Sequence, residues 1–307
     1  MQRLASLALL LAPLAVAAAI LFAFASSTSD APGGPVAVAS TPPARDEPSA
    51  PTISVDGVDA FHVELRKPPR AGLVFDLGSG EVLWRRDPMQ VLPIASLTKI
   101  MTALLVVERT RPRDPVLITQ AALDYSGSGI GMLPKGRRVR AEALLNGLMI
   151  VSGNDAAIAL AVHIAGNERR FVALMNRRAR KWGLTCTHFA SSHGLEPGNR
   201  SCARDLGVLA RIAMSRQRIR RVVGRTQAVL RFPIKGGKLY LYGHNPLMRL
   251  GYAGTIGLKT GYTDEAGRCF VGVVRRAGRT LGVVLLDSRD PAKHAPKLLD
   301  AAFATSG

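Results

Sequence analysis

The chain contains the run RCFVGVVRRAGRTLGVVLL at residues 268–286, towards its C-terminus. Two apolar, β-branched segments, Arg268–Arg275 and Thr280–Leu286, stand on either side of a turn at Gly278, and this pattern predicts a β-hairpin. Far upstream, residues 71–82 read AGLVFDLGSGEV and predict a second hairpin around a glycine-rich turn. Strands at such distant places in the chain indicate one antiparallel sheet built from both ends of the folded part.

The residues between the two hairpins have helical patterns. Apolar residues recur at helical spacing from Ile100, through residues 142–165 and through residues 168–182, and Ser152-Gly153-Asn154 interrupts the second stretch. A closing helix is predicted from Pro296, as a first-turn proline, to about Ala304. The expected fold class is therefore mixed α/β, of the α+β kind, with an antiparallel β-sheet flanked by helices.

The first residues indicate an exported protein. Residues 1–25 carry one charge, Arg3, ahead of an apolar run that ends in Ala-Phe-Ala, and such small residues are what signal peptidase requires. The run is also long enough to span a bilayer, so a retained N-terminal membrane anchor is the alternative to a signal peptide. Residues 26–54 are rich in Pro, Ala and Ser and are predicted to form a linker ahead of a folded domain at 55–307. Both alternatives place that domain in the periplasm or on the cell-wall side of the cytoplasmic membrane.

The chain is strongly basic, with a formal net charge of +19. This charge is typical of proteins that bind nucleic acid, but export argues against a nucleic-acid partner. The expected anionic partner is a membrane surface or an acidic wall polymer. One dense basic run, residues 177–181, stands beside apolar residues at helical spacing, which indicates a solvated helix face.

The three cysteines are an odd number for an exported protein. Cys186 and Cys202 flank a loop rich in Ser, His, Gly, Pro and Asn, and we predict a disulfide between them. Cys269 lies in a β-rich run and is predicted to be a buried free thiol.

Three short motifs stand in order: Ser96-Leu97-Thr98-Lys99, Ser152-Gly153-Asn154 and Lys259-Thr260-Gly261. A serine and a lysine three residues apart on a helix share a face, so the amine can lie beside the hydroxyl. Serine is a poor nucleophile until a base takes its proton, and lysine, with an ordinary pKa of about 10.4, is no base at neutral pH. Burial and a second cation both lower a lysine pKa, and Lys259 is the candidate for that cation. Each motif alone occurs by chance in many proteins, but three in this order on an exported chain point to an acyl-transfer site.

The second and third motifs can serve a substrate. Ser152 falls at a break between helices, where its side chain can point into a cleft and relay a proton, and Asn154 can bind a substrate amide or orient the lysine of the first motif. The third motif stands just before a predicted strand, where its lysine and threonine would hold a carboxylate. Its glycine would let a peptide lie along the strand edge.

The segments around the motifs resemble those of serine-type D-alanyl-D-alanine carboxypeptidases and endopeptidases, the low-molecular-mass penicillin-binding proteins. The likeness is carried by LPIASLTKIMTA at residues 92–103, SGNDAA at 152–157 and GLKTGYTDEAG at 257–267, and it covers roughly residues 71–304. It implies a β-lactamase-like fold with an all-helical subdomain, no cofactor and a catalytic domain at 55–307. It also implies peptidoglycan stem peptides as substrates and β-lactam antibiotics as covalent inhibitors.

The resemblance assigns three residues to catalysis, Ser96 as the acylated nucleophile, Lys99 as its general base and Ser152 as a proton relay. It assigns five residues to substrate binding: Asn154, Lys259, Thr260, Gly261 and Tyr262. The backbone N–H groups of Ser96 and Tyr262 would form the oxyanion hole.

The bond that is cut is less clearly indicated. Removal of the terminal D-Ala is the first interpretation, but the stretch at residues 267–269 looks like the endopeptidase branch, which cuts cross-bridges. An arginine that contacts the substrate carboxylate in many family members has three competing counterparts here: Arg289, Lys293 and His294. The C-terminal β-domain and amphipathic helix of several members have no counterpart after the closing helix.

Four other interpretations are weaker. A class A β-lactamase needs a deacylating glutamate, and the corresponding residues 175–179 read MNRRA. A zinc peptidase needs clustered ligands, whereas the six histidines are scattered, so no metal is implied. The glycine-rich residues 126–131 lack the Gly-Lys-Ser/Thr of a phosphate loop. A non-catalytic wall-binding envelope protein would have no need of an intact serine and both lysines.

Overall fold

The computed structural model describes residues 50–305. The predicted leader at residues 1–25 and most of the predicted linker at 26–54 therefore lie outside the described residues. Ile53, near the end of that linker, is buried in the core beside Leu73 and Phe75. No helix within residues 50–305 combines the length and the apolar character needed to cross a membrane.

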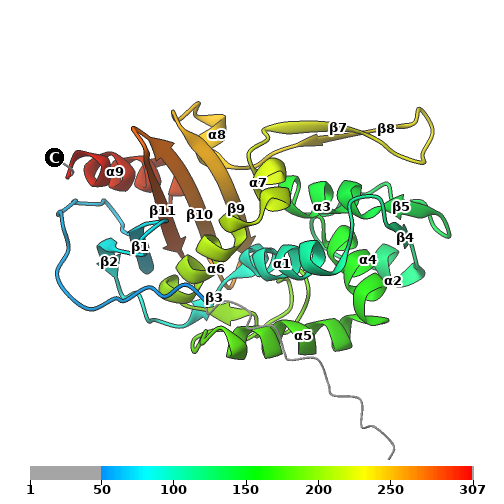
Figure 1. The fold of residues 1–307 in the computed structure, drawn as a ribbon, viewed down its shortest axis with the longest axis horizontal. Helices are drawn as coiled ribbons and strands as arrows, with labels where there is room; N and C mark the ends of the chain where they lie inside the picture. The colour runs from blue at the N-terminus through cyan, green and yellow to red at the C-terminus, as the bar shows by residue number, and fades with distance from the viewer. Residues whose placement is uncertain (1–49, 306–307) are drawn as a thin grey trace, which may run out of the picture. The chain divides into compact units, whose positions relative to one another are not determined.

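Five strands form one antiparallel sheet in the order β2-β1-β11-β10-β9 (Figure 1). Their bounds are Ala71–Asp76 (β1), Val82–Arg86 (β2), Thr255–Thr263 (β9), Gly267–Arg276 (β10) and Arg279–Leu286 (β11). The pairing of β1 with β11 joins the two predicted hairpins, with Ala71 opposite Leu286. The predicted α+β sheet of distant segments is thus confirmed, and β9 is left as an edge strand.

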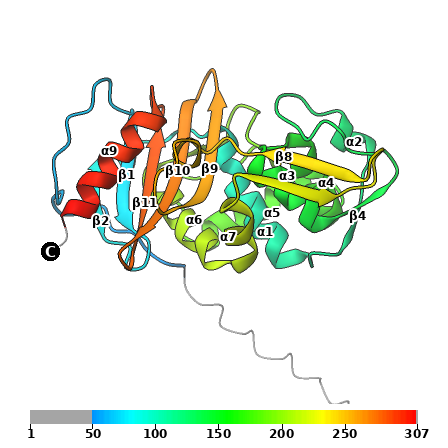
Figure 2. The ribbon, with the colours of Figure 1, turned by 90° about the horizontal axis from the view of Figure 1, so that it is seen from above.

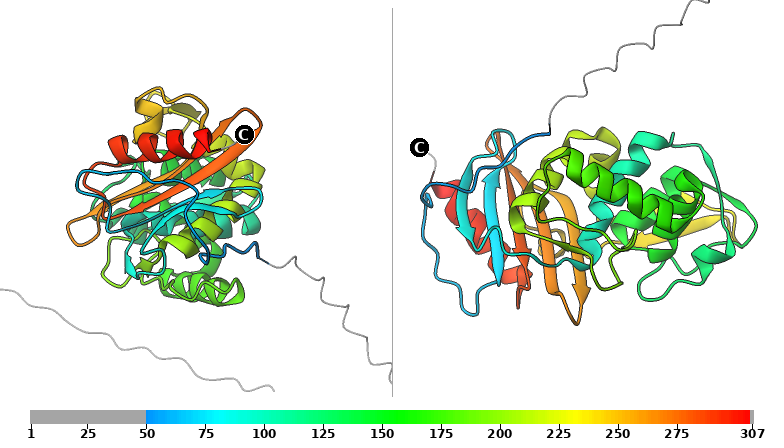
Figure 3. Two further views of the ribbon diagram at one scale, coloured as in Figure 1. Left: turned by 90° about the vertical axis from the view of Figure 1, so that its left-hand side faces the viewer. Right: turned by 90° about the horizontal axis from the view of Figure 1, so that it is seen from below.

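Helices cover both faces of the sheet, as Figure 3 shows. The side chains of β11 alternate: Val283 and Leu285 belong to the apolar cluster under α9, while Val284 and Leu286 belong to the larger core that includes α6. Helix α6 spans Ala203–Ser215 and α9 spans Pro291–Ala304.

The predicted start of the closing helix at Pro296 was wrong. The helix α9 begins at Pro291, and Pro296 lies inside it. The Asp290 side chain caps it by accepting the backbone N–H of Lys293 at 3.3 Å. An aspartate cap followed by proline at the first helical position is a stronger start signal than a proline alone.

The remaining helices pack beside the sheet around a central helix. The central helix is α1 (Lys99–Arg109), which contacts each of the larger helices α3 to α7 and is buried over its first eight residues. The others are α2 (Gln120–Leu123), α3 (Ala141–Ile150), α4 (Asn154–Ala165), α5 (Glu168–Lys181), α7 (Gln217–Val223) and α8 (Pro246–Arg249). The predicted helices in this part of the chain are confirmed, and the break between α3 and α4 covers residues 151–153, with Asn154 as the first residue of α4.

Three short two-stranded ladders complete the described fold. They are β3 (Leu92–Pro93) with β6 (Arg200–Ser201), β4 (Pro115–Leu117) with β5 (Arg138–Arg140), and β7 (Gln227–Arg231) with β8 (Lys238–Tyr242). The predicted disulfide between Cys186 and Cys202 is confirmed, with a Cα–Cα distance of 5.5 Å. Cys269 is a buried free cysteine, as predicted.

Candidate active site

The three motifs meet at one cavity of about 650 Å³. Ser96 reaches it from the 3₁₀ turn Ala95–Thr98 that leads into α1. Ser152 reaches it from the break between α3 and α4, and Thr260 and Gly261 from the edge strand β9. Segments far apart in the chain therefore present their polar groups to a single space.

Lys99 is fully buried and has three oxygen neighbours. Its Nζ lies 2.9 Å from Ser96 Oγ, 2.7 Å from Asn154 Oδ1 and 2.8 Å from the carbonyl oxygen of His193. A neutral amine has two N–H donors and one lone pair. Asn154 Oδ1 and the carbonyl oxygen can only accept, so they take both N–H groups and leave the lone pair for the serine hydroxyl.

The electrostatic surroundings favour that neutral amine. Burial first, and the charge of Lys259 second, lower the pKa of Lys99 well below its ordinary value. Asp155 and Glu196 oppose this shift through their negative charge. Burial also lowers the pKa of Lys259, to about 7.

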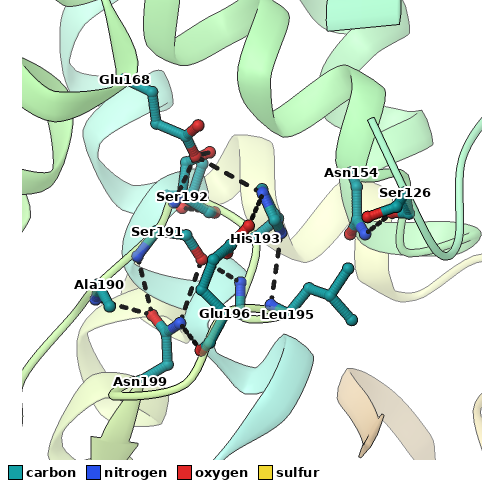
Figure 4. Close-up of polar contacts among 12 residues, drawn as sticks. Ser126, Asn154, Glu168, Ala190, Ser191, Ser192, His193, Leu195, Glu196 and Asn199 are labelled. Atoms are coloured by element: carbon teal, nitrogen blue, oxygen red, sulfur yellow. Dashed lines mark hydrogen bonds and ion pairs between the residues drawn. The ribbon is translucent and has the colours of Figure 1, made fainter. Parts of the chain in front are cut away.

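Ser152 and Asn154 have different surroundings although they are two residues apart. Ser152 has a left-handed backbone with φ of 62°, and its Oγ is buried with no hydrogen-bond partner among residues 50–305. Asn154 is engaged at both ends of its amide. Its Nδ2 donates to the Ser126 carbonyl at 2.6 Å (Figure 4), and its Oδ1 accepts from Lys99. Ser152 is thus the second-motif residue with unused hydrogen-bonding capacity at the cavity.

The glycine-rich residues 126–131 contact the second motif and contribute Ser128 to the cavity lining, a role that the sequence reasoning missed. Asp155 accepts the backbone N–H groups of Ile130 and Gly131, each at 2.9 Å. The backbone N–H of Asn154 donates to the Ser128 carbonyl at 2.7 Å, and Ser128 lines the cavity. The signal available in the sequence was an aspartate directly after the second motif together with a glycine-rich segment, whose backbone N–H groups a carboxylate can bind.

The third motif lies inside β9, so its predicted position just before a strand was wrong. Ladder pairing with β10, which places Lys259 opposite Val271, outweighs the low strand propensity of the glycines in this segment. A Cβ at Gly261 would lie 2.9 Å from the Ser96 backbone nitrogen, so glycine is what lets the strand approach the serine this closely. Lys259 Nζ donates to the Thr260 carbonyl at 2.8 Å.

Residues 190–199 form a loop that contacts α1 and holds a backbone carbonyl against Lys99. Ser192 donates its N–H and hydroxyl to Glu168 Oε1 at 2.9 and 2.5 Å (Figure 4), and its carbonyl accepts the Thr102 hydroxyl. Asn199 accepts two backbone N–H groups of the loop through Oδ1. The neighbouring His193 carbonyl is therefore held against Lys99 by contacts to both α1 and α5.

The His193 ring takes no part in the contact to Lys99. Its Nδ1 accepts the Leu195 N–H at 3.3 Å, so the proton belongs on Nε2, which faces Glu196 at 3.3 Å and Glu168 at 3.7 Å. Burial lowers the pKa of this histidine.

Two arginines line the cavity. Arg289 lines it, whereas Lys293 is 82% exposed and pairs with Asp290. The third candidate, His294, is buried beside the Ser288 hydroxyl at 2.8 Å. Arg268, which the sequence reasoning missed, also lines the cavity and donates to the Arg289 carbonyl at 2.8 Å.

Tyr262 also lines the cavity. It is 63% exposed, and its hydroxyl donates to Asp264 at 2.8 Å. It pairs across the ladder with Arg268.

One cluster elsewhere in residues 50–305, Cys186, Cys202 and Asp205, has metal-ligand spacing. Its two sulfurs form the disulfide and therefore offer no thiolates to a metal ion.

Comparison with known proteins gives a consistent result. Residues 68–290 match the model of the family described as D-alanyl-D-alanine carboxypeptidase. The D-alanyl-D-alanine carboxypeptidase DacF of Bacillus subtilis is 33% identical over 250 residues, which cover 78% of this chain and 64% of that protein. This chain therefore spans slightly less than two thirds of that relative.

Two further similar proteins are matched over most of their own length. The crystal structure of a D-alanyl-D-alanine carboxypeptidase from Mycobacterium tuberculosis H37Rv superposes with a TM-score of 0.74 at 34% identity, covering 81% of this chain and 96% of that one. A D-alanyl-D-alanine endopeptidase of Pseudomonas aeruginosa is 31% identical over 261 residues, 76% of this chain and 80% of that protein.

Proposed function

The chain belongs to the D-alanyl-D-alanine carboxypeptidase family, and from this membership we propose that it is a serine D,D-peptidase of peptidoglycan. It removes the terminal D-Ala of stem peptides through an acyl-enzyme on Ser96. The observation that carries the proposal is the buried Lys99 amine, 2.9 Å from Ser96 Oγ, whose other two neighbours can only accept hydrogen bonds.

Acylation follows from that geometry. The Lys99 amine takes the hydroxyl proton as Ser96 Oγ attacks the carbonyl carbon of the penultimate residue. The C–N bond to the terminal residue then breaks, and the proton held by Lys99 passes through the Ser152 hydroxyl to the leaving amine, so Lys99 is neutral again. In the second half of the reaction Lys99 takes a proton from water as the water attacks the Ser96 ester, and it passes this proton to Ser96 Oγ when the ester C–O bond breaks. The backbone N–H groups of Ser96 and Tyr262 hold the oxyanion in both halves.

The substrate lies along β9. Gly261 lets β9 lie close to Ser96, so a peptide backbone that pairs with the strand edge comes within reach of the nucleophile. Lys259 and Thr260 hold the terminal carboxylate, and Arg289 supplies a further cation in the cavity lining. Asn154 orients Lys99.

Labelling with a fluorescent penicillin tests this proposal. We expect a stable covalent adduct on Ser96, because the chain lacks the deacylating glutamate of class A β-lactamases. Ser96→Ala should abolish both the adduct and the release of D-Ala from a pentapeptide, whereas Ser54→Ala at an exposed position should preserve both. A labelled Ser96→Ala protein would exclude Ser96 as the nucleophile.

Cutting of cross-bridges is the second candidate function, favoured by the endopeptidase relative of Pseudomonas aeruginosa. A cross-linked dimeric stem peptide and a monomeric pentapeptide, assayed in parallel, separate the two activities. Faster cleavage of the dimer would assign the endopeptidase activity.

The proposed place of action is outside the cytoplasm, with an anionic membrane surface or wall polymer as the partner of the basic chain. The apolar run of residues 1–25 supports export. Sequencing the N-terminus of the protein recovered from the envelope would distinguish a cleaved leader from a retained anchor.

A further inference from the structure

The β7–β8 hairpin has two unlike faces. Ala228, Leu239 and Leu241 are buried, and the hairpin packs against α3 through this side (Figure 2). Their neighbours along each strand alternate with them and are exposed. We call these exposed residues, Gln227, Val229, Arg231, Lys238, Tyr240 and Tyr242, the outer hairpin face.

The outer hairpin face is apolar and aromatic in its middle. Val229 lies directly opposite Tyr240, and Tyr242 lies opposite Gln227. Val229, Tyr240 and Tyr242 are 56%, 55% and 62% exposed, so three large side chains stand together in solvent. Clustered exposure of this kind marks an interaction surface, whereas single exposed apolar residues need no explanation.

Three cations without acidic partners stand at the turn end of this apolar strip. Arg231 lies opposite Lys238, and Lys235 stands in the turn between the strands; all three are exposed. No aspartate or glutamate occurs between Asp205 and Asp264. Among residues 50–305 no carboxylate forms an ion pair with any of the three.

We propose that the outer hairpin face docks on a lipid bilayer with an anionic surface. Tyrosine suits the membrane–water interface, because its ring is apolar and its hydroxyl stays hydrated. Lysine and arginine reach the lipid phosphates, and each contributes about 1 kcal/mol near an anionic surface. A dissolved acidic polymer would match the cations but would leave Val229 and the tyrosine rings in water.

This docking surface goes beyond the proposed peptidase activity but lies close to its site. His244, two residues after β8, lines the catalytic cavity. A hairpin docked on the bilayer would therefore hold the cavity near the membrane surface, where wall precursors carried on lipid would be within reach.

A fluorescent reporter at Tyr240 tests the proposal in the full chain. Tyr240→Trp is mixed with vesicles of phosphatidylglycerol and phosphatidylcholine, some carrying brominated acyl chains, and the signal of the native Trp84 and Trp182 is subtracted. We expect a blue shift of the emission and quenching by the brominated lipid. Met89→Trp, at another exposed apolar position, should show neither. An unchanged circular dichroism spectrum and melting temperature show that each variant is folded.

Charge variants of the reporter protein test the role of the cations. Lys235→Gln with Lys238→Gln should weaken the vesicle interaction about fivefold for each cation removed, as about 1 kcal/mol per cation requires. The matched pair Lys67→Gln with Lys297→Gln removes two exposed charges elsewhere and should leave it unchanged.

Three results would overturn the proposal. The first is an emission of the Tyr240→Trp reporter that vesicles do not alter, and the second is equal quenching of the Tyr240→Trp and Met89→Trp proteins. The third is binding of poly-glutamate with the same charge dependence but without quenching by lipid, which would identify a dissolved polyanion as the partner. These readouts do not depend on peptidase activity, so they stand apart from the test of Ser96.

Discussion

The N-terminal end of α1 and the edge strand β9 each contribute one buried lysine to the site, and the two lysines have different surroundings. Lys99 lies within 2.7–2.9 Å of three oxygen atoms from three segments of the chain. Lys259, in contrast, has its hydrogen bond to the carbonyl of the next residue, Thr260. Burial lowers the pKa of both, but for Lys99 the charge of Lys259 adds to the effect. The same side chain is thus a base in one place and a cation that acts on the base in the other.

The largest effect is expected from removing the base. Lys99→Ala should lower the acylation rate roughly a thousandfold, since general bases contribute about 10²–10⁴-fold. Lys99→Arg should give no rescue, because a guanidinium stays protonated and has no lone pair for Ser96. Stopped-flow acylation by a chromogenic β-lactam measures both. An arginine variant within tenfold of wild type would mean that a group other than Lys99 takes the proton.

Removal of Lys259 should have the next largest effect, a rate loss of roughly a hundredfold. The ascending limb of the pH–rate profile should move to higher pH, because losing the neighbouring charge raises the pKa of Lys99. Lys259→Arg keeps the charge but not the compact ammonium, so partial recovery is expected.

The substrate terminus separates the two roles of Lys259. A peptide with a free terminal carboxylate should lose more rate in Lys259→Ala than the same peptide with an amidated terminus. Equal losses on both would show that Lys259 acts through Lys99 alone and does not read the terminus, which would favour cross-bridge cleavage.

The lowered pKa of Lys259 also predicts a pH-dependent stability. Its pKa is about 7 in the fold and 10.5 ordinarily, so between these values the unfolded chain binds a proton that the folded chain does not. Burial of this lysine therefore destabilises the fold fully below about pH 7, and the effect fades as the pH rises towards 10.5. Lys259→Met should raise the free energy of unfolding by a few kcal/mol at pH 7 and by less at pH 10. Urea titrations at both pH values measure this, with the exposed Lys297→Met as control; a difference that is the same at both would contradict it.

The smallest effect on the acylation rate is expected from reduction of the disulfide. The loop that it closes contacts Lys99 but not Lys259. The bridge between Cys186 and Cys202 closes the loop that contains the His193 carbonyl. Bridging a loop of this length stabilises a fold by about 3 kcal/mol. Reduction should therefore lower the melting temperature and slow acylation a few-fold, because the contact to Lys99 loosens. Cys269→Ala keeps the bridge and should show the same sensitivity to reductant; an unchanged melting temperature on reduction would contradict the prediction.

Local patterns predicted four of the five strands of the main sheet and five of the six described helices with ten or more residues, but not β9 or α6. Alternating apolar residues and turn glycines gave the hairpins of β1–β2 and β10–β11, and helical spacing gave α3, α4 and α5. Both errors, the start of α9 and the position of Lys259-Thr260-Gly261, concern boundaries. The first and last residues of a helix or strand depend on capping side chains and on the neighbouring strand, and intrinsic residue propensities describe neither well.

By itself, the sequence determined the family, the three motifs and the disulfide, because each of these is a matter of residue type and order along the chain. Only the tertiary structure decided what surrounds each group. It placed the His193 carbonyl against Lys99 and Arg268 beside Arg289. It also placed the Asp155 carboxylate against the backbone N–H groups within residues 126–131. All three contacts use backbone N–H or C=O groups, which residues of every type carry and no pattern distinguishes. The pKa of a lysine likewise depends on burial and on charges brought close by folding, and these quantities do not exist before the chain has folded.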